Sequence, residues 1–283
     1  MRVALATCVR KPEPDPDEEL LAQALARAGA RPRVLAWDDP GARWDEVELC
    51  VLRSTWNYPR RPGAFLAWVD RVAAATRLCN PREVVRWNLH KGYLRELADR
   101  GVPVVETAHV PRGAAPGLAR LLAERGWTEA VVKPAVSAAS FGTWRVGQVD
   151  AEAQQGRFAA DVAARDTMVQ PYMRAVEGHG ERALVWIDGA LTHAIRKQPR
   201  FFGEDEEVSA ALEIAADERA VAEAALAPLA DALLYARVDV VRDDLGAPRV
   251  MELELIEPSL YLLQHPPALA RLVAAIVRRL RAG

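Results

Sequence analysis

Three carboxylates and one guanidinium stand at alternating positions on two strand-like runs of the chain. Arg237 and Asp239 are two residues apart, as are Glu252 and Glu254, and the turn-prone segment Asp243–Pro248 lies between the pairs. Side chains two residues apart on a β-strand point to the same face. A hairpin that turns within this segment would place Asp239 opposite Glu252. By the same register, Arg237 would face Glu254.

Such a group of acids has one physical consequence. Carboxylates this close repel one another, and burial makes their charged forms costlier. Arg237 offsets only one of the charges. A hard divalent cation such as Mg²⁺ would offset the others, since it takes oxygen ligands and works beside substrate phosphates. The same pattern fits an amphipathic hairpin whose polar face is simply hydrated, and the hairpin alone does not decide between the two.

Two lysines are candidates for holding an anion. Lys133 ends the apolar run VVKP, and seven of the nine residues at 135–143 are Ala, Ser, Thr or Gly. The backbone N–H groups and hydroxyls of such a loop can approach a phosphate closely, although the chain has neither a GxxxxGK[ST] nor a GxGxxG signature. Lys91 falls in the first turn of a helix expected over 89–100, where it opposes the helix dipole. Taken alone, Lys91 is more simply a solvated surface residue.

Two further segments are compatible with nucleotide binding. In the run MVQPYM, Pro171 lacks a donor and frees neighbouring backbone groups, and adenine needs one donor and one acceptor from such an edge. Glu177 could accept hydrogen bonds from ribose hydroxyls. A hairpin expected over 183–195, with its turn at DG, delivers Arg196 and Lys197 at its end.

The first eighty residues alternate strand-like and helix-like segments, which predicts a parallel sheet covered by helices. The third strand runs into the loop RSTWNY, residues 53–58. Ligands of open α/β sheets bind beyond the carboxyl ends of the strands. This loop therefore offers a cation, hydroxyls, an amide and aromatic rings to a small polar substrate. A surface loop with Trp56 packed for structural reasons is an equally good interpretation.

Composition limits the classes of function. The chain has 283 residues, a formal net charge of −2, 51% hydrophobic and 27% charged residues. This charge gives no footprint for nucleic acid, and no apolar run reaches the ~18 residues that a membrane span needs. No targeting segment is evident. Cys8, Cys50 and Cys79 are widely spaced, and the five histidines show no zinc spacing, so we expect neither a disulfide framework nor a zinc site, and a reduced cytoplasmic setting.

In their order along the chain, these pieces resemble the ATP-grasp superfamily. The pieces are Lys91, VVKP, the small-residue loop, QPY, RVD, and ELE before Pro-Ser, and the resemblance covers roughly residues 80–283. LRSTWNY and ELELIEPSL resemble the group that contains the O-ureidoserine cyclo-ligase of cycloserine biosynthesis. The resemblance implies an α/β ATP-grasp fold, in which two α+β subdomains clasp ATP, preceded by a Rossmann-like pre-ATP-grasp domain. The expected ranges are 1–80 for the pre-ATP-grasp domain, 81–172 for the N-terminal subdomain and 173–283 for the C-terminal subdomain.

The resemblance also implies ATP and Mg²⁺ as cofactors and a role for each matching residue. The nucleotide contacts that it implies are the phosphate-holding lysines Lys91 and Lys133, the closing loop with Ser137, Ser140 and Gly142, the adenine hinge at Gln170 and Tyr172, the ribose acceptor Glu177, and the basic residues Lys197 and Arg196 near the γ-phosphate. The implied metal ligands are Asp239, Glu252 and Glu254. Arg237 would stabilise the transferring phosphoryl group and, with Lys197, belongs to the implied catalytic set. Two positions depart from the family pattern: Glu254 stands where many members carry Asn, and His90 where an acid often precedes the first lysine.

The reaction implied is an ATP-dependent carboxylate–amine ligation through an acylphosphate, on a small amino-acid-like substrate and with ring closure as one version. The expected substrate contacts are Arg53, Thr55, Trp56, Asn57 and Tyr261. Two other classes stay open: a small-molecule kinase that retains the phosphate on its substrate, and a non-catalytic nucleotide-binding module. A metal-dependent hydrolase would not explain the two lysines and the small-residue loop. The sequence does not indicate an oligomeric state.

Overall fold

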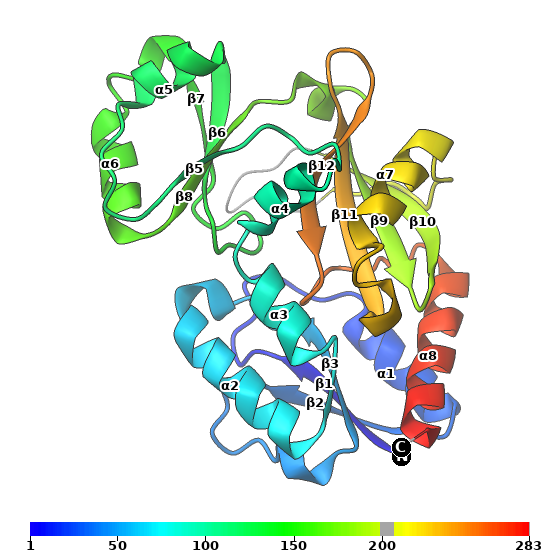
Figure 1. Ribbon diagram of the computed structural model, residues 1–283. Coiled ribbons are helices and arrows are strands. Elements are labelled where there is room, and N and C mark those ends of the chain that lie inside the picture. The colour runs from blue at the N-terminus through cyan, green and yellow to red at the C-terminus, as the bar shows by residue number, and fades with distance from the viewer. Residues whose placement is uncertain (199–206, 283) are drawn as a thin grey trace.

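The computed structural model describes residues 1–198 and 207–282. Within these residues the chain forms three sheets of four strands each, one at the base and two above it (Figure 1). The two upper sheets face each other across the region where the expected site residues lie. None of the helices in the described residues is long and apolar enough to cross a membrane.

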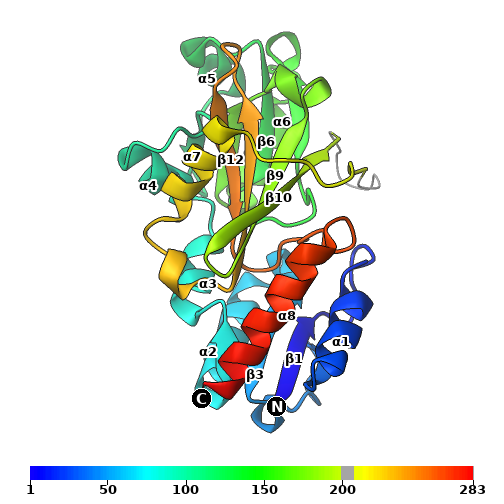
Figure 2. The ribbon, with the colours of Figure 1, turned by 90° about the vertical axis from the view of Figure 1, so that its right-hand side faces the viewer.

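The basal sheet is parallel, as expected for the first eighty residues, with the strand order β2-β1-β3-β4. Its central strands β1 and β3 are almost completely buried, because helices cover both faces (Figures 1 and 2). The elements are β1 (Arg2–Thr7), α1 (Glu18–Arg27), β2 (Arg31–Ala36), β3 (Leu49–Ser54), α2 (Pro62–Ala75) and β4 (Arg77–Cys79).

One upper sheet carries Lys133 and the small-residue loop. Its order is β5-β8-β6-β7, with antiparallel pairing, and two helices cover its outer face (Figure 1). The elements are β5 (Ala108–Val110), α5 (Leu118–Arg125), β6 (Glu129–Pro134), β7 (Trp144–Gly147), α6 (Gln155–Ala164) and β8 (Thr167–Pro171).

The other upper sheet has the order β10-β9-β11-β12 and is antiparallel. Its elements are β9 (Glu181–Ile187), β10 (Ala190–Lys197), α7 (Ala216–Leu226), β11 (Tyr235–Arg242) and β12 (Pro248–Glu254). The expected turn at Asp188-Gly189 joins β9 to β10, and both residues have positive φ, at 48° and 89°.

The pairing expected for the carboxylate hairpin is confirmed. Asp239 lies opposite Glu252, and Arg237 lies opposite Glu254. The alternate residues, which include Val238 and Leu253, are buried in a core cluster on the other face. Beyond Asp239 the register shifts, so that Val240 pairs with Val250. The alternation of polar and apolar residues therefore sets the register where the acids lie.

The C-terminal helix α8 (Pro266–Arg281) packs against both the basal sheet and the sheet formed by β9–β12. It lies beside α1 (Figure 2), and one core cluster contains side chains of β1, β9 and α8, such as Leu5, Val185 and Ile276. We keep the ranges 1–80, 81–172 and 173–283 as a proposal, since each contains one sheet. The shared core means that the first and third ranges do not pack independently of each other.

The structure differs from the expected elements in two places. The helix expected over 89–100 begins only at Tyr93, as α4 (Tyr93–Asp99), and a separate helix α3 (Arg82–Asn88) precedes it, with Lys91 in the turn between them. The largely apolar run 102–110, which predicts a strand, forms β5 only at its end, and Val104 makes an isolated bridge to Val250. In both places a tertiary contact decides the local structure: the Lys91 N–H donates to the Ala135 carbonyl oxygen, 2.8 Å away.

A buried histidine on β10 predicts an acid-sensitive fold. His193 is 2% exposed, and its ring stacks on His265 with 4.6 Å between the ring centroids. Burial, helped by the charge of His265, lowers the pKa of His193 from 6.5 to about 4. The unfolded chain therefore binds the extra proton between these pH values, and the free energy of unfolding falls as pH falls through them.

We expect a loss of about 2 kcal/mol from His193 between pH 7 and pH 5. Urea unfolding at the two pH values measures it, and His193→Gln should reduce the pH dependence. If wild type and His193→Gln lost stability equally on acidification, His193 would not be the cause.

Candidate active site

One cavity of about 200 Å³ between the two upper sheets gathers most of the expected nucleotide and metal residues. Polar side chains line it on the β11–β12 side and on the loop after β6, and apolar side chains line the part next to β8. The expected residues on its wall are Lys91, Lys133, Ser137, Ser140, Gln170, Tyr172, Lys197, Arg237, Asp239, Glu252 and Glu254.

Arg237 and Asp239 form the centre of the polar wall. The Nε and Nη2 groups of Arg237 donate to the two carboxylate oxygens of Asp239 at 2.8 Å each, and Nη2 also contacts Glu254. The Lys197 ammonium donates to Asp239 Oδ2 at 2.6 Å and pairs with Glu181. The two carboxylates of β11 and β12 are therefore held by cations that are themselves buried or nearly so.

Glu252 is shared by two lysines that hold it differently. Lys91 pairs directly with Glu252 and donates from Nζ to the Ser137 carbonyl oxygen at 3.0 Å, whereas Lys133 Nζ lies 3.9 Å from Glu252 Oε2. Lys91 is 6% exposed, so the interpretation of Lys91 as a solvated surface residue is wrong. The turn between α3 and α4 brings it inward because its N–H is bound by Ala135.

The electrostatics of the cations follow from these contacts. Burial opposes the charge of Lys91, but Glu252 outweighs it and raises the lysine's pKa above the ordinary value. Burial lowers the pKa of Lys133, because its more distant contact with Glu252 compensates only in part. Lys197 has a pKa well above the ordinary value despite its burial, owing to Asp239 and Glu181.

The pKa values of the buried carboxylates shift in opposite directions, depending on whether nearby cations outweigh the effect of burial. Burial would raise the pKa of Asp239, but Arg237 and Lys197 hold that pKa well below its usual range. Burial raises the pKa of Glu254 to about 7: Arg237 opposes the change, and the charges of Asp239 and Glu252 add to it. Among the described residues, the cavity wall thus holds four cations, Lys91, Lys133, Lys197 and Arg237, against four acids, Glu181, Asp239, Glu252 and Glu254.

The small-residue loop has an unusual backbone. Ala139, Ser140 and Gly142 have φ of 49°, 54° and 71°, and a Cβ on Gly142 would lie 2.9 Å from Pro134 Cγ. The Ser137 hydroxyl donates to the Phe141 carbonyl oxygen at 3.0 Å, which closes the loop on itself. Successive left-handed residues turn backbone N–H groups toward one side, an arrangement that suits an anion.

The apolar part of the cavity is a slot of the kind that a flat ring fills. Its walls come from β6, the bulged part of β12, the segment before β5 and the segment after β8, and they are Val131, Met251, Val105, Met173 and Val176. Gln170 and Tyr172 lie on the same wall, and the Tyr172 N–H donates to the Glu129 carbonyl oxygen at 3.0 Å. Apolar walls beside a polar edge are typical of nucleobase and cofactor sites.

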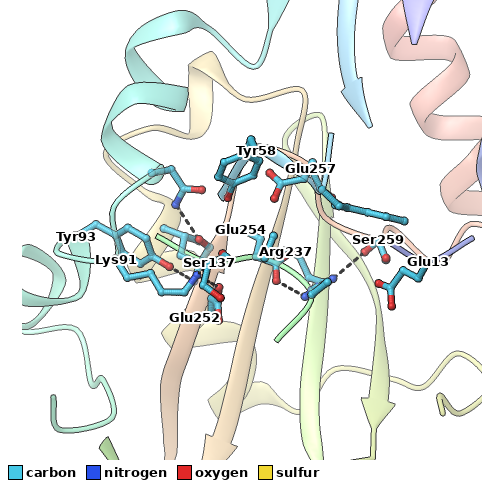
Figure 3. Close-up of a pocket in the computed structure, with 15 residues that line it drawn as sticks. Glu13, Tyr58, Lys91, Tyr93, Ser137, Arg237, Glu252, Glu254, Glu257 and Ser259 are labelled. Carbon is cyan, nitrogen blue, oxygen red and sulfur yellow. Dashed lines mark hydrogen bonds and ion pairs between the residues drawn. The ribbon is translucent and has the colours of Figure 1, made fainter. Parts of the chain in front are cut away.

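A second, smaller cavity of about 50 Å³ adjoins the first, and Lys91, Arg237, Glu252 and Glu254 line both. Figure 3 shows its far side, where Glu257 lies beside Tyr58, with Glu254 and Arg237 nearby. Burial, together with the charge of Glu254, raises the pKa of Glu257 to about 8. The smaller cavity therefore has an acidic wall of its own.

Several expected site residues lie outside the two cavities. Glu177 accepts from the Tyr172 hydroxyl at 2.8 Å, and Arg196 donates to the Gly178 carbonyl oxygen at 2.7 Å. Arg53 and Thr55 have no exposed surface. The remaining residues are Asn57, whose side chain binds Trp37 and Asp38, Tyr261, whose ring lies 5.7 Å from the Arg237 guanidinium carbon, and Gly142. Trp56 does line the smaller cavity.

The sequence reasoning missed three acids that border the cavities, and one of them, Glu13, lines the smaller cavity. Glu181 faces Lys197 across the β9–β10 hairpin, and this pairing depends on a register shift between Leu191 and His193. A hairpin counted without that shift would pair Lys197 with another residue. Glu257 follows the end of β12, where the alternation of faces no longer applies. Its position three residues after Glu254 gave no signal.

No preformed metal cluster of three or more His, Cys, Asp or Glu side chains occurs in residues 1–198 and 207–282. The reason is visible in the contacts: Asp239, Glu252 and Glu254 are each paired with a lysine or arginine. The donor chemistry nevertheless fits a hard cation, since all three are oxygen ligands on the wall of one cavity. Their role as metal ligands stays a prediction.

Comparison with known proteins identifies related chains. The family model described as the N-terminal domain of D-cycloserine synthetase DcsG matches residues 3–80. The cycloserine biosynthesis protein DcsG of Streptomyces lavendulae is 36% identical over 287 residues, which cover 94% of this chain and 95% of the relative.

Solved structures show the same fold. The crystal structure of D-cycloserine synthetase DcsG superposes with a TM-score of 0.90 at 36% identity, covering 99% of this chain and 100% of the other. The ATP-grasp ligase PsnB, solved with a minimal precursor, Mg and ADP, gives a TM-score of 0.62 at 20% identity and covers 97% and 96% of the two chains. The second likeness concerns the fold alone.

Proposed function

Because the chain belongs to the DcsG family of ATP-grasp ligases, which form C–N bonds, we propose that it joins a small carboxylate to an amine through an acylphosphate. We further propose that the substrate is amino-acid-like and that the bond closes a ring within one molecule. ATP and Mg²⁺ are the cofactors of this proposal, and a small molecule supplies the carboxylate and the nitrogen.

One observation carries the proposal. The cations Lys133, Lys197 and Arg237 and the acids Asp239 and Glu252 line a single cavity that also has an apolar slot. This set matches what phosphoryl transfer from a nucleotide requires, namely groups that hold the phosphates, groups that hold a metal, and a site for the base. The acids on their own would also suit a metal-dependent hydrolase. Such a hydrolase would not require the apolar slot, which a nucleotide's base would fill.

The residues of the chain have distinct tasks in this proposal. Lys133 is buried and only loosely paired, so its ammonium is available to a phosphate. Arg237 offers a planar fork of donors next to the place where charge would develop on the transferring phosphoryl group. When bound to Asp239, Glu252 and Glu254, Mg²⁺ would neutralise charge on the phosphate oxygens. The small-residue loop covers this end of the cavity and would keep water from an acylphosphate.

The structure supports one change in the implied nucleotide contacts. Glu181 borders the cavity, whereas the Glu177 side chain is 56% exposed and binds Tyr172 instead. We therefore propose Glu181 as the acceptor for the ribose hydroxyls. Gln170 and Tyr172 keep their proposed place at the adenine edge.

The test is release of inorganic phosphate from ATP and Mg²⁺ in the presence of a panel of amino acids that includes O-ureidoserine. We expect phosphate release that depends on the amino acid, and a hydroxamate when hydroxylamine is added, since hydroxylamine captures an acylphosphate. A kinase would leave the phosphate on its product. A nucleotide-binding module would bind ATP without turnover, and either of these results would refute the proposal.

A further inference from the structure

The Glu257 side chain is a buried acid without a cation. It is 7% exposed and borders the smaller cavity, and its carboxylate has no ion-pair partner among the residues that the structure describes. The Tyr58 hydroxyl interacts with the Glu257 carboxyl group. Buried carboxylates in proteins are ordinarily paired with a positive group, so Glu257 lacks a partner that its surroundings call for.

The cations of the same cavity are already engaged by other acids. Arg237 binds Asp239 through two nitrogens, and Lys91 pairs with Glu252. Neither can neutralise Glu257 without giving up its present partner. Without a cation, burial keeps Glu257 mainly in its neutral form, in line with its pKa of about 8, and a cationic group of a ligand in the cavity would stabilise the carboxylate.

The backbone around Glu257 is held in place at each residue. The carbonyl oxygens of Ile256, Glu257 and Pro258 accept hydrogen bonds from the side chains of Tyr235 at 2.8 Å, Trp56 at 2.9 Å and Arg53 at 3.1 Å, respectively. Arg53 comes from the end of β3, and Trp56 comes from the loop that follows it. The end of β3 and the loop after it therefore position the backbone that carries the carboxylate, and Arg53 does so from full burial.

The walls of the smaller cavity suit an organic cation better than a metal ion. The rings of Trp56 and Tyr58 lie on the same wall as Glu257. Aromatic rings attract ammonium groups through their negative faces, but they supply no oxygen ligands to Mg²⁺. A cavity of about 50 Å³ admits a group a little larger than one water molecule.

We propose that Glu257 determines substrate specificity by binding the primary ammonium group of an amino-acid substrate, with Tyr58 beside it. The substrate carboxylate then points toward Arg237, which borders both cavities. This inference rests on the proposed function and adds to it the residue that binds the ammonium group of the substrate. Trp56 and Arg53 are positioning residues for Glu257 and do not bind the substrate amine.

The experiment compares two probes that differ by one amino group, O-ureidoserine and 3-(ureidooxy)propanoate. Their affinities are measured by calorimetry with the full-length protein, Mg²⁺ and a non-hydrolysable ATP analogue. We expect wild type to bind the amino probe about 10- to 100-fold more tightly, as a charge-assisted hydrogen bond would allow. Glu257→Gln should remove most of this ratio and leave the affinity of the other probe within about twofold.

Matched variants separate a binding role from a structural one. Trp56→Phe keeps a ring but loses the donor to the Glu257 carbonyl oxygen, and it should reduce the ratio by a smaller factor. Glu181→Gln, on the nucleotide side, should weaken binding of the ATP analogue and keep the ratio. Glu257→Asp should restore part of the ratio, because the charge returns on a shorter side chain.

Each outcome decides the inference independently of the ligase proposal. Equal affinity of wild type for the two probes, or no binding of either, would overturn it, as would an altered Mg²⁺ requirement in Glu257→Gln. Turnover of O-ureidoserine by wild type would uphold the ligase proposal even if Glu257→Gln bound both probes normally. In that case Glu257 would be excluded as the reader of the amine.

Discussion

Arg237→Ala is expected to lower kcat by about 10²–10³-fold, the loss typical when a donor to developing charge is removed. The Arg237 guanidinium is the largest cationic group that borders both cavities, and it binds Asp239 with two nitrogens. Its removal also leaves Glu254 without a cation, so we expect a decrease of about 3 kcal/mol in the free energy of unfolding. Steady-state phosphate release and urea unfolding measure the two effects.

Two further variants distinguish a loss of catalysis from a loss of stability in this test. Arg237→Lys keeps a positive charge beside Asp239 but loses the planar fork, so it should recover most of the stability and little of the rate. Arg242→Ala removes an arginine from the other end of β11, where it binds Asp217, and should leave kcat within about twofold. A stable Arg237→Lys protein with wild-type kcat would remove Arg237 from the catalytic set.

The pairing of acids in the β11–β12 hairpin could be predicted because it depends on residues that are close together in the sequence. Alternation of polar and apolar residues sets the faces, and the turn segment sets the register. Asp239 and Glu252 could therefore be placed opposite each other before any tertiary contact was known. The same holds for the β9–β10 turn, where Asp188-Gly189 specifies the backbone.

Positions that depend on contacts between distant segments could not be predicted in this way. Lys91 is turned inward by a bond to Ala135, and no local pattern indicates that bond. Glu257 becomes part of a cavity wall only because Trp56 and Arg53, about two hundred residues earlier in the chain, hold its backbone. The resemblance to a family supplied Lys91, because it draws on the order of motifs; it did not supply Glu257.

The loop after β3 illustrates how a correct location can accompany a different role. Its position at the carboxyl end of a central strand indicated a site, and Trp56 does border the smaller cavity. However, the strand carries Arg53 into the core between two sheets, where a guanidinium can donate only to the backbone that it meets. The residue types of this loop and its place after a strand correctly predicted that it lies near a site. The burial of Arg53 determined that it contacts the backbone there and does not border a cavity.

Lys133 and Lys91 should respond in opposite ways to the same substitution, although both approach Glu252. The pKa of Lys133 is lowered by burial, which means that folding disfavours its charge. Lys133→Met should therefore raise the free energy of unfolding by about 1 kcal/mol, while it removes the proposed phosphate contact and raises KM for ATP more than about tenfold. The pKa of Lys91 is raised by Glu252, so folding favours its charge, and Lys91→Met should lower the free energy of unfolding by about 3 kcal/mol.

Thermal or urea unfolding without nucleotide, paired with KM for ATP, gives both quantities for each variant. A gain in stability together with a loss of nucleotide affinity in Lys133→Met would mean that the chain maintains an unfavourable buried charge for its ligand, since 3.9 Å separates Lys133 from its nearest acid. If Lys133→Met instead destabilised the protein as much as Lys91→Met, Lys133 would be a structural partner of Glu252. The assignment of Lys133 to the nucleotide phosphates would then lose its physical basis.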